Sequence, residues 1–269
     1  MRIVVPIKQV PETNAVTMDP QTGTMIREGV EAIINPLDLY AIESAIRLRE
    51  AHGGEVIALS MGPPKAISAL KEAIAMGADS AVLLSDKAFA GSDTWATSYV
   101  LAAAIRRMGD YDLIICGERA TDGDTGQVGP GIAAWLDLPT VSYVGKIDEL
   151  ITGASAPALR VHRLVEDGHE ILEAELPCLL TVVKEVADPR LPTLRGKQRA
   201  RKADIPAWGA DDLDVQPESL GLNGSPTRVV KIFRPKVARQ CQKLQPADEQ
   251  ALSEAVDQLV EFLRTKQVL

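Results

Sequence analysis

A glycine-rich stretch between a predicted strand and a predicted helix contains the residue types that bind an anion. It runs from Gly117 to Pro130 with the sequence GERATDGDTGQVGP. Glycines let a backbone approach a ligand closely, and the free amides at the start of a helix favour a phosphate group. We therefore predict an anion-binding loop, followed by a helix that begins near Gln127 with Thr125 as its cap.

Two other interpretations of this stretch stay open. Its four glycines could be no more than a flexible strand-to-helix connection, and the stretch matches neither G-x-G-x-x-G nor the P-loop pattern. Asp122 and Asp124 could be metal ligands, but no histidine lies close to them in the sequence. In the interpretation we favour, the two carboxylates orient backbone amides or bind a ribose or ribityl hydroxyl group.

The elements that would position this loop alternate regularly along the chain. Apolar strands are predicted at 2–7, 55–62, 80–86 and 112–117, and helices at 36–52, 65–77 and 92–108. The first of these helices has Asn35 as a predicted cap, Pro36 at its first position and Asp38 in its first turn. This alternation predicts an α/β fold, a Rossmann-like parallel sheet with helices on both faces, which binds ligands at the carboxyl ends of its strands.

The second half of the chain follows a different pattern. Antiparallel strands are predicted at 141–150, 158–165 and 169–176, and a further apolar strand at 177–186. The basic segment 188–206 is either a solvated face or a docking surface for an acidic partner. We expect 208–235 to be an extended tail and 246–268 to be an amphipathic helix, both lying on another subunit or a neighbouring domain.

Composition excludes several classes of protein. A net charge of −8 and an aromatic content of 4% argue against nucleic-acid binding. No apolar run approaches the roughly 20 residues that cross a bilayer, so membrane insertion is not expected. The three cysteines are far apart in the sequence and cannot form a metal cluster by spacing. We expect a cytoplasmic protein.

With these motifs in view, the chain resembles the β subunit of electron-transferring flavoproteins, and most of all the electron-bifurcating type. The resemblance covers nearly the whole chain. It is carried by VVPIKQVP at 4–11, INPLDLYAIESAIRL at 34–48, LSMGP at 59–63, AIAMGAD at 73–79, the 117–130 loop, LPCLLT at 176–181 and ADPRLPTLRG at 187–196. It implies a heterodimer with an α subunit, in which residues 1–203 form the nucleotide- or FAD-binding domain. Residues 204–269 would form a C-terminal arm whose helix packs on the α subunit.

The resemblance also implies particular site residues. The cofactor contacts that it carries over are Pro6, Asn35, Pro36, Leu37, Asp38, Met61, Gly117, Arg119, Ala120, Thr121, Asp122, Gly123, Asp124, Thr125, Gly126, Gln127 and Val128. Arg119 would face a flavin or its phosphates, or else form an exposed salt bridge. Within a recognition loop at 187–196, Leu194 would anchor a partner dehydrogenase, although Arg195 stands where some relatives have proline. No side chain is implied as a catalytic acid or base, and no metal ligand is implied.

Two subclasses of this family differ in what the β subunit binds. In simple carriers the ligand is a structural AMP, whereas in bifurcating members it is FAD, with NAD as substrate. The small residues Gly123 and Gly126 favour FAD because they leave room for a chain that continues past the AMP portion. That FAD would take electrons from NADH. It would send them through the α-subunit FAD to an acyl-CoA dehydrogenase-like flavoprotein, and to ferredoxin or flavodoxin. The alternatives are the AMP-binding carrier and, more distantly, a stand-alone nucleotide-binding regulatory module.

Overall fold

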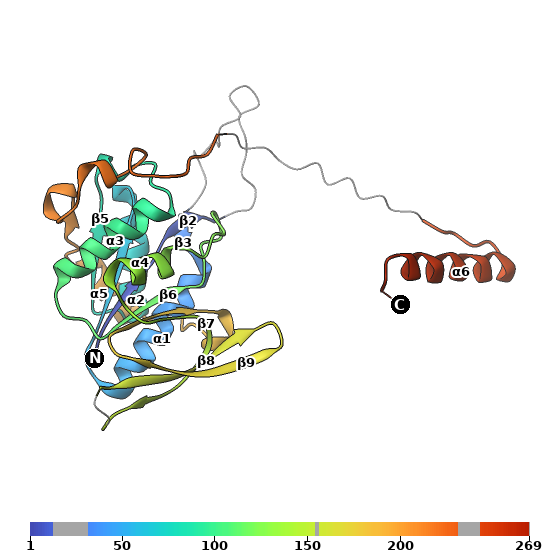
Figure 1. Ribbon diagram of the computed structural model, residues 1–269, viewed down its shortest axis with the longest axis horizontal. Helices are drawn as coiled ribbons and strands as arrows, with labels where there is room; N and C mark the ends of the chain where they lie inside the picture. The colour runs from blue at the N-terminus through green and yellow to red at the C-terminus, as the bar shows by residue number, and fades with distance from the viewer. Residues whose placement is uncertain (13–31, 154–155, 231–242, 269) are drawn as a thin grey trace. The chain divides into compact units, whose positions relative to one another are not determined.

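The larger of two compact units is built on a mostly parallel sheet. The computed structural model describes residues 1–12, 32–153, 156–230 and 243–268, and the units are 1–230 and 231–269 (Figure 1). The strand order of the sheet is β11-β5-β4-β1-β6-β10-β7-β8-β9. The strands are β1 (Arg2–Pro6), β4 (Glu55–Met61), β5 (Ser80–Leu84), β6 (Leu113–Gly117), β7 (Thr140–Ile151), β8 (Ala158–Val165), β9 (Gly168–Glu175), β10 (Cys178–Val182) and β11 (Ala207–Trp208).

Helices cover both faces of this sheet, as the sequence predicted. They are α1 (Pro36–His52), α2 (Ile67–Met76), α3 (Thr94–Met108), α4 (Val128–Leu136) and α5 (Leu194–Lys202). Side chains alternate along each strand, so Ile3 and Val5 of β1 pack in the core under α1 and α2, while Val4 packs in the core under α3 and α4. Helices α3 and α4 lie side by side (Figure 1). The predicted α/β class is therefore confirmed.

The antiparallel strands extend the sheet at one edge. β7, β8 and β9 form a meander, and residues 166 and 167 turn between the last two strands. β10 lies between β6 and β7 and is parallel to both. All five residues of β10 are buried, because a central parallel strand has helices or neighbouring segments on both faces.

A short antiparallel ladder joins β2 (Gln9–Pro11) to β3 (Ala32–Ile34). Of the residues between these two strands, 13–31 lie outside the described residues. The ladder brings Lys8 and Asn35 together, since the amide of Asn35 donates a 2.7 Å hydrogen bond to the carbonyl of Lys8. The start of α1 is thereby fixed beside the end of β1.

The first part of the predicted arm lies on the larger unit. β11 pairs with β5, and Leu213 and Leu220 are buried in the core under α3. The larger unit ends at Val230, so residues 204–230 belong with the α/β body. The packing of 231–269 on an α subunit stays a prediction.

The smaller unit contains α6 (Glu249–Thr265), within the predicted helix of 246–268. Asp248 caps it by accepting a hydrogen bond from the amide of Ala251. None of its residues is buried, and it carries an exposed apolar stripe of Leu252, Val256, Leu259 and Phe262. Such a helix requires a partner surface to remove that stripe from water.

Candidate functional site

Three neighbouring strands end at one edge of the sheet, next to the glycine-rich loop. β4, β1 and β6 are adjacent and parallel, and their carboxyl ends lie at Met61, Pro6 and Gly117. The loop 118–127 leaves the end of β6 and leads into α4. The structure therefore brings these sequence-predicted residues to one edge, where parallel sheets bind ligands.

Asn35 connects the start of α1 to this loop. Its side-chain amide donates a 2.9 Å hydrogen bond to the carbonyl of Arg119, and its side-chain oxygen accepts a 3.1 Å bond from the amide of Thr121. Asn35 occupies the N-cap position of α1, as predicted, but its side chain makes no capping hydrogen bond. That part of the prediction is wrong, because the loop uses the side chain instead.

Asp38 is a buried carboxylate in the first turn of α1. One oxygen accepts a 2.7 Å hydrogen bond from the amide of Lys8, and the other accepts a 2.9 Å bond from the side chain of Asn35. Burial raises the pKa of Asp38 to about 7, although these two hydrogen bonds act in the opposite direction. Asp38 therefore joins the end of β1 to the residue that binds the loop.

The loop presents a run of free backbone amides. Within the described ranges, no hydrogen-bond acceptor is found for the amides of five consecutive residues, 125–129. The backbone bends through positive φ angles at Asp124 (54°) and Gly126 (64°) before α4 begins. Free N–H groups at the start of a helix carry partial positive charge, so this backbone suits an anion such as a phosphate.

The glycines of this stretch serve two different purposes. A Cβ on Gly117 would lie 2.5 Å from Asp38 Oδ1 and 2.8 Å from the carbonyl carbon of Leu37, and one on Gly129 would lie 2.7 Å from Thr181. These two glycines are required for close packing. By contrast, a Cβ on Gly123 would meet nothing within 4 Å, and one on Gly126 would make only an ordinary contact. Packing therefore does not explain Gly123 or Gly126.

Charged side chains of the loop are paired with one another and with the end of β1. Lys8 binds Asp122 at 2.7 Å, and Arg119 binds Asp124 at 2.9 Å and Glu118 at 3.3 Å. Arg119 thus adopts the exposed salt bridge that the sequence left open. No group of three or more histidine, cysteine or acidic side chains gathers as a metal site in the part of the chain that the structure describes.

Helix α4 begins at Val128, which confirms its predicted start near Gln127. The predicted cap at Thr125 is wrong, because Gln127 is the N-cap residue and no side chain caps the helix. The side-chain oxygen of Gln127 accepts a 2.8 Å hydrogen bond from the hydroxyl of Thr94, at the start of α3. Sequence reasoning missed Thr94 because no pattern links residues that far apart in the chain.

A second candidate site lies in the segment 187–202, where two leucines face solvent. Leu191 is 87% exposed and Leu194 is 82% exposed. Leu194 is the first residue of α5, and Thr193 caps this helix by accepting a hydrogen bond from the amide of Gly196. The structure therefore presents Leu194 at a fixed helix start. Its predicted contact with a partner stays a prediction.

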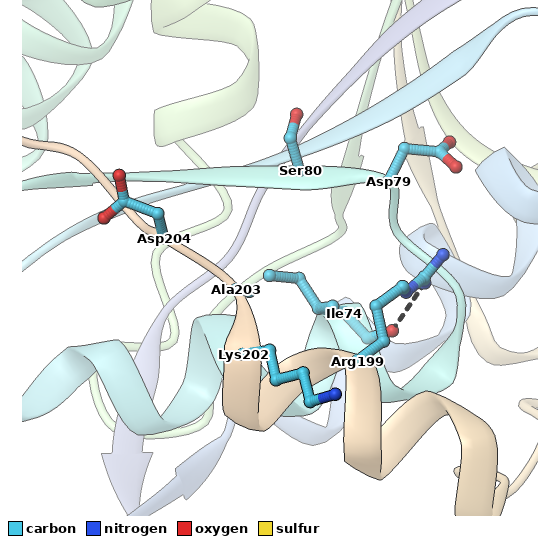
Figure 2. A pocket seen from close by; sticks show the side chains of 7 residues that line it. All are labelled: Ile74, Asp79, Ser80, Arg199, Lys202, Ala203 and Asp204. Carbon is cyan, nitrogen blue, oxygen red and sulfur yellow. Dashed lines mark hydrogen bonds between the residues drawn. The ribbon is translucent and has the colours of Figure 1, made fainter.

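Two arginines of the basic segment hold it on the body. Arg190 binds the buried carboxylate of Glu43 at 2.8 Å and the exposed carboxylate of Glu50 at 2.6 Å. Arg199 donates 2.8 Å hydrogen bonds to the carbonyls of Ile74 and Ala78 at the end of α2, and Figure 2 shows the first of these. The sequence suggested that the basic segment is either a solvated face or a docking surface for an acidic partner. Neither description covers Arg190 and Arg199, because these two residues bind the body and stabilise the fold.

Two shallow pockets lie away from the glycine-rich loop. One of about 330 Å³ lies between α5 and the amino end of β5 and includes Asp79, Ser80 and Lys202 (Figure 2). Another of about 420 Å³ is lined by Ala88 and by residues between 210 and 223. The first is at the amino edge of β5, whereas a Rossmann-like sheet binds its ligand at the carboxyl edge.

Comparison with known proteins identifies the family. Residues 22–213 match the electron transfer flavoprotein domain. The chain is 48% identical over 270 residues to the electron transfer flavoprotein subunit beta of Thermoanaerobacterium thermosaccharolyticum, with all of both chains covered. It belongs to the electron transfer flavoprotein family. Its closeness to a full-length β subunit confirms the recognition made from the sequence motifs.

Other relatives of this β subunit have more specific names. It is 51% identical over 236 residues to the caffeyl-CoA reductase-Etf complex subunit CarD of Acetobacterium woodii, covering 87% of this chain and 88% of CarD. It is 43% identical over 262 residues to the protein FixA of Azorhizobium caulinodans, covering 95% and 92%. Membership in this family implies a redox role in electron transfer. None of the described helices is both long and apolar enough to cross a membrane.

Proposed function

We propose that this chain is the β subunit of an electron-bifurcating flavoprotein heterodimer and that it binds FAD at the loop after β6. Bound there, FAD would supply two-electron chemistry with NADH and one-electron transfer to two acceptors. The acceptors would be the α-subunit flavin, leading to an acyl-CoA dehydrogenase-like partner, and ferredoxin or flavodoxin. The complex would act in the cytoplasm.

The observation that carries this proposal is the run of amides at residues 125–129, which have no acceptor among the described residues and lie at the carboxyl edge of the sheet. A diphosphate is the part of FAD that such amides bind best, because each N–H is a preorganised donor and the α4 dipole adds positive potential. A Cβ on Gly123 would meet nothing within 4 Å, which leaves room for the adjoining parts of the cofactor. The site residues predicted from the sequence stay a proposal as ligand contacts.

One feature favours FAD over a structural AMP. Neither packing nor a positive φ angle requires a glycine at position 123, so its small size suits a ligand that extends past one phosphate. A relative of this chain belongs to a complex with a caffeyl-CoA reductase, which supports a reductase or dehydrogenase acting on an acyl-CoA as partner. The AMP-binding carrier remains the alternative, since the free amides would bind its single phosphate as well.

Cofactor analysis of the purified heterodimer tests the proposal. We expect about two FAD and no AMP per heterodimer, and reduction of both flavins by NADH. One FAD with one AMP would instead establish the simple carrier. A β chain that is stable alone and binds nucleotide without flavin would favour the regulatory module. Nucleotide and protein are quantified from the same acid-extracted sample, so that partial loss of cofactor is visible.

Leu194 is proposed as the anchor for the partner dehydrogenase. It is exposed at the start of a capped helix. Helix α5 is held on α2 by the hydrogen bonds of Arg199, and Gly196 permits their close approach, since a Cβ there would lie 2.0 Å from the carbonyl oxygen of Ala75. An exposed apolar side chain on a rigid support loses little conformational freedom on binding. The exposed Leu191 beside it supplies further apolar surface.

A further inference from the structure

Two of the sequence-predicted cofactor contacts, Asn35 and Asp38, lie too deep to touch a cofactor with their side chains. Asn35 is fully buried, and Asp38 is only 6% exposed. Gly117 and the start of α1 enclose Asp38 so tightly that even a methyl group on Gly117 would clash with its carboxylate. A buried polar side chain must find its partners inside the protein, and both residues do.

These side chains form one chain of hydrogen bonds that ends at the loop. The amide of Lys8 donates to Asp38 Oδ2, and Asn35 Nδ2 donates to Asp38 Oδ1. The same Asn35 nitrogen donates to the carbonyl of Arg119, and Asn35 Oδ1 accepts from the amide of Thr121. Asn35 therefore binds one acceptor and one donor of the loop backbone.

The direction of these bonds depends on Asp38. An ionised carboxylate only accepts hydrogen bonds, so it must face the NH₂ group of Asn35. That orientation directs the oxygen of Asn35 toward the amide of Thr121. If the Asn35 amide were rotated by half a turn, its NH₂ group would face another N–H, its oxygen would face a carbonyl, and both loop contacts would be lost.

We propose that Asn35 and Asp38 are positioning residues for the nucleotide-binding loop, with Asp38 fixing the orientation of the Asn35 side chain and Asn35 fixing the backbone at Arg119 and Thr121. The inference rests on the proposed function, because it assumes that the loop binds a nucleotide. The loop would reach the ligand with its amides already in place, so less ordering cost is incurred on binding.

Nucleotide affinity should depend on the protonation of Asp38. Burial raises the pKa of Asp38 to about 7, opposed by Asn35 and Lys8 and reinforced by the charge of Asp122. The titratable side chains facing it are Lys8 from the end of β1, Cys116 from β6 and Asp122 from the loop. Protonated Asp38 can donate to the oxygen of Asn35, which permits the rotated amide and releases the loop. Nucleotide affinity should therefore fall as the pH drops through about 7.

Fold stability should respond to pH in the opposite direction. The pKa of Asp38 is raised in the folded state above its usual value of 3.8. Protonation of this group therefore favours folding, and its stabilising effect is lost as the pH rises from about 4 to about 7. If Asp38 served the fold alone, a change in its protonation would change affinity and stability in the same direction. A positioning role instead predicts that affinity rises with pH while the free energy of unfolding falls.

The test is calorimetric titration of FAD, between pH 6 and 8.5, into a heterodimer that keeps its α-subunit FAD but has been freed of the nucleotide bound to this chain. FAD is the main probe because its diphosphate does not titrate in this range, whereas a phosphate monoester such as AMP has a second pKa near 6. We expect wild-type affinity for FAD to fall several-fold from pH 8 to pH 6. Asn35→Asp and Asp38→Asn should bind FAD about tenfold more weakly at pH 8, and Asp38→Asn should show no pH dependence. AMP is titrated in parallel, with Asp38→Asn as the baseline for its phosphate.

Asp79→Asn is the matched control. Asp79 also accepts a backbone hydrogen bond, from Val56 at 2.8 Å, but it lies at the amino edge of the sheet. It should lower the melting temperature without changing the affinity. Unchanged affinity in Asn35→Asp, or an equal loss in Asp79→Asn, would overturn the proposal. A flat wild-type profile would do so even if the variants failed to fold, and a wild-type complex that bound neither nucleotide would refute the proposed function itself.

Discussion

The connections that follow β6 and β10, two neighbouring central strands, are built in contrasting ways. After β6, the loop 118–127 offers backbone amides and is held by side chains from elsewhere, chiefly Asn35 and Lys8. After β10, the segment 187–193 binds the body through its own Arg190 and exposes leucine side chains. Free amides suit a phosphate, and exposed leucines suit a protein surface. Two connections that leave neighbouring parallel strands in the same direction therefore present different chemistry, backbone amides in one and apolar side chains in the other.

The largest effect should come from Gly117, where the loop begins. Gly117→Val places a Cβ against Asp38 and the backbone of Leu37, neither of which can move without shifting α1. We expect a loss of about 3 kcal/mol or more in the free energy of unfolding, together with loss of bound nucleotide. Thermal and denaturant unfolding of the heterodimer measure the first, and cofactor extraction measures the second.

Gly123→Ala is the control for this variant. A Cβ on Gly123 would meet nothing within 4 Å, so stability should change by less than about 0.5 kcal/mol. If Gly117→Val were as stable as Gly123→Ala, the close approach of α1 to the end of β6 would not be a constraint on this fold.

In the segment 187–193 after β10, Arg190→Ala should lower the free energy of unfolding by about 2 kcal/mol, because it removes partners from the buried carboxylate of Glu43. Burial alone would raise the pKa of Glu43, but its hydrogen bonds to Arg190 and Arg47 lower it overall. A lowered pKa contributes stability above the ordinary value of 4.5 and loses it as the pH falls below that value. Unfolding measured from pH 7 to pH 3 should therefore converge for wild type and variant in acid.

Arg160→Ala serves as the comparison on the meander. Arg160 binds Glu173 at 2.7 Å and also binds Glu149, and all three side chains are exposed to solvent, so its removal should lower stability much less than the removal of Arg190. Equal losses from the two arginines would show that the ion pairs of Arg190 are ordinary surface pairs.

The sequence predicted the parallel sheet, its helices and the meander because strand and helix periods are local patterns. It also located the amide-rich loop, since glycines and a proline indicate a backbone that leaves a strand and starts a helix. Asn35 at the start of α1 was predicted as a cap, and the loop instead uses its side chain. Thr94 and the pairing of Lys8 with Asp122 were not predicted at all. These contacts join residues distant in sequence, so only the folded chain specifies them.

Leu194→Ala tests the protein-binding side of the comparison. Removing the proposed apolar anchor should lower the rate of electron transfer to the proposed partner dehydrogenase about tenfold, equivalent to about 1.4 kcal/mol of binding free energy. Cofactor content and melting temperature should not change, because the side chain is 82% exposed. Ile171→Ala, on β9 and 62% exposed, is a control that should leave the rate unaltered. A tenfold loss in that control would show that the effect is not specific to this segment.

Gly126→Asn tests the amide side with the smallest expected effect. Gly126 has φ of +64°, a region that asparagine tolerates better than most residues, and its Cβ would lie 3.4 Å from the carbonyl of Glu118. The fold should therefore lose only about 1 kcal/mol of stability, the low end of the cost of a side chain in this region. The longer side chain would occupy space beside the free amides, so FAD retention after gel filtration should fall several-fold. Flavin content equal to that of wild type would mean that a ligand does not pass this position, and the loop would then bind a phosphate without the rest of a dinucleotide.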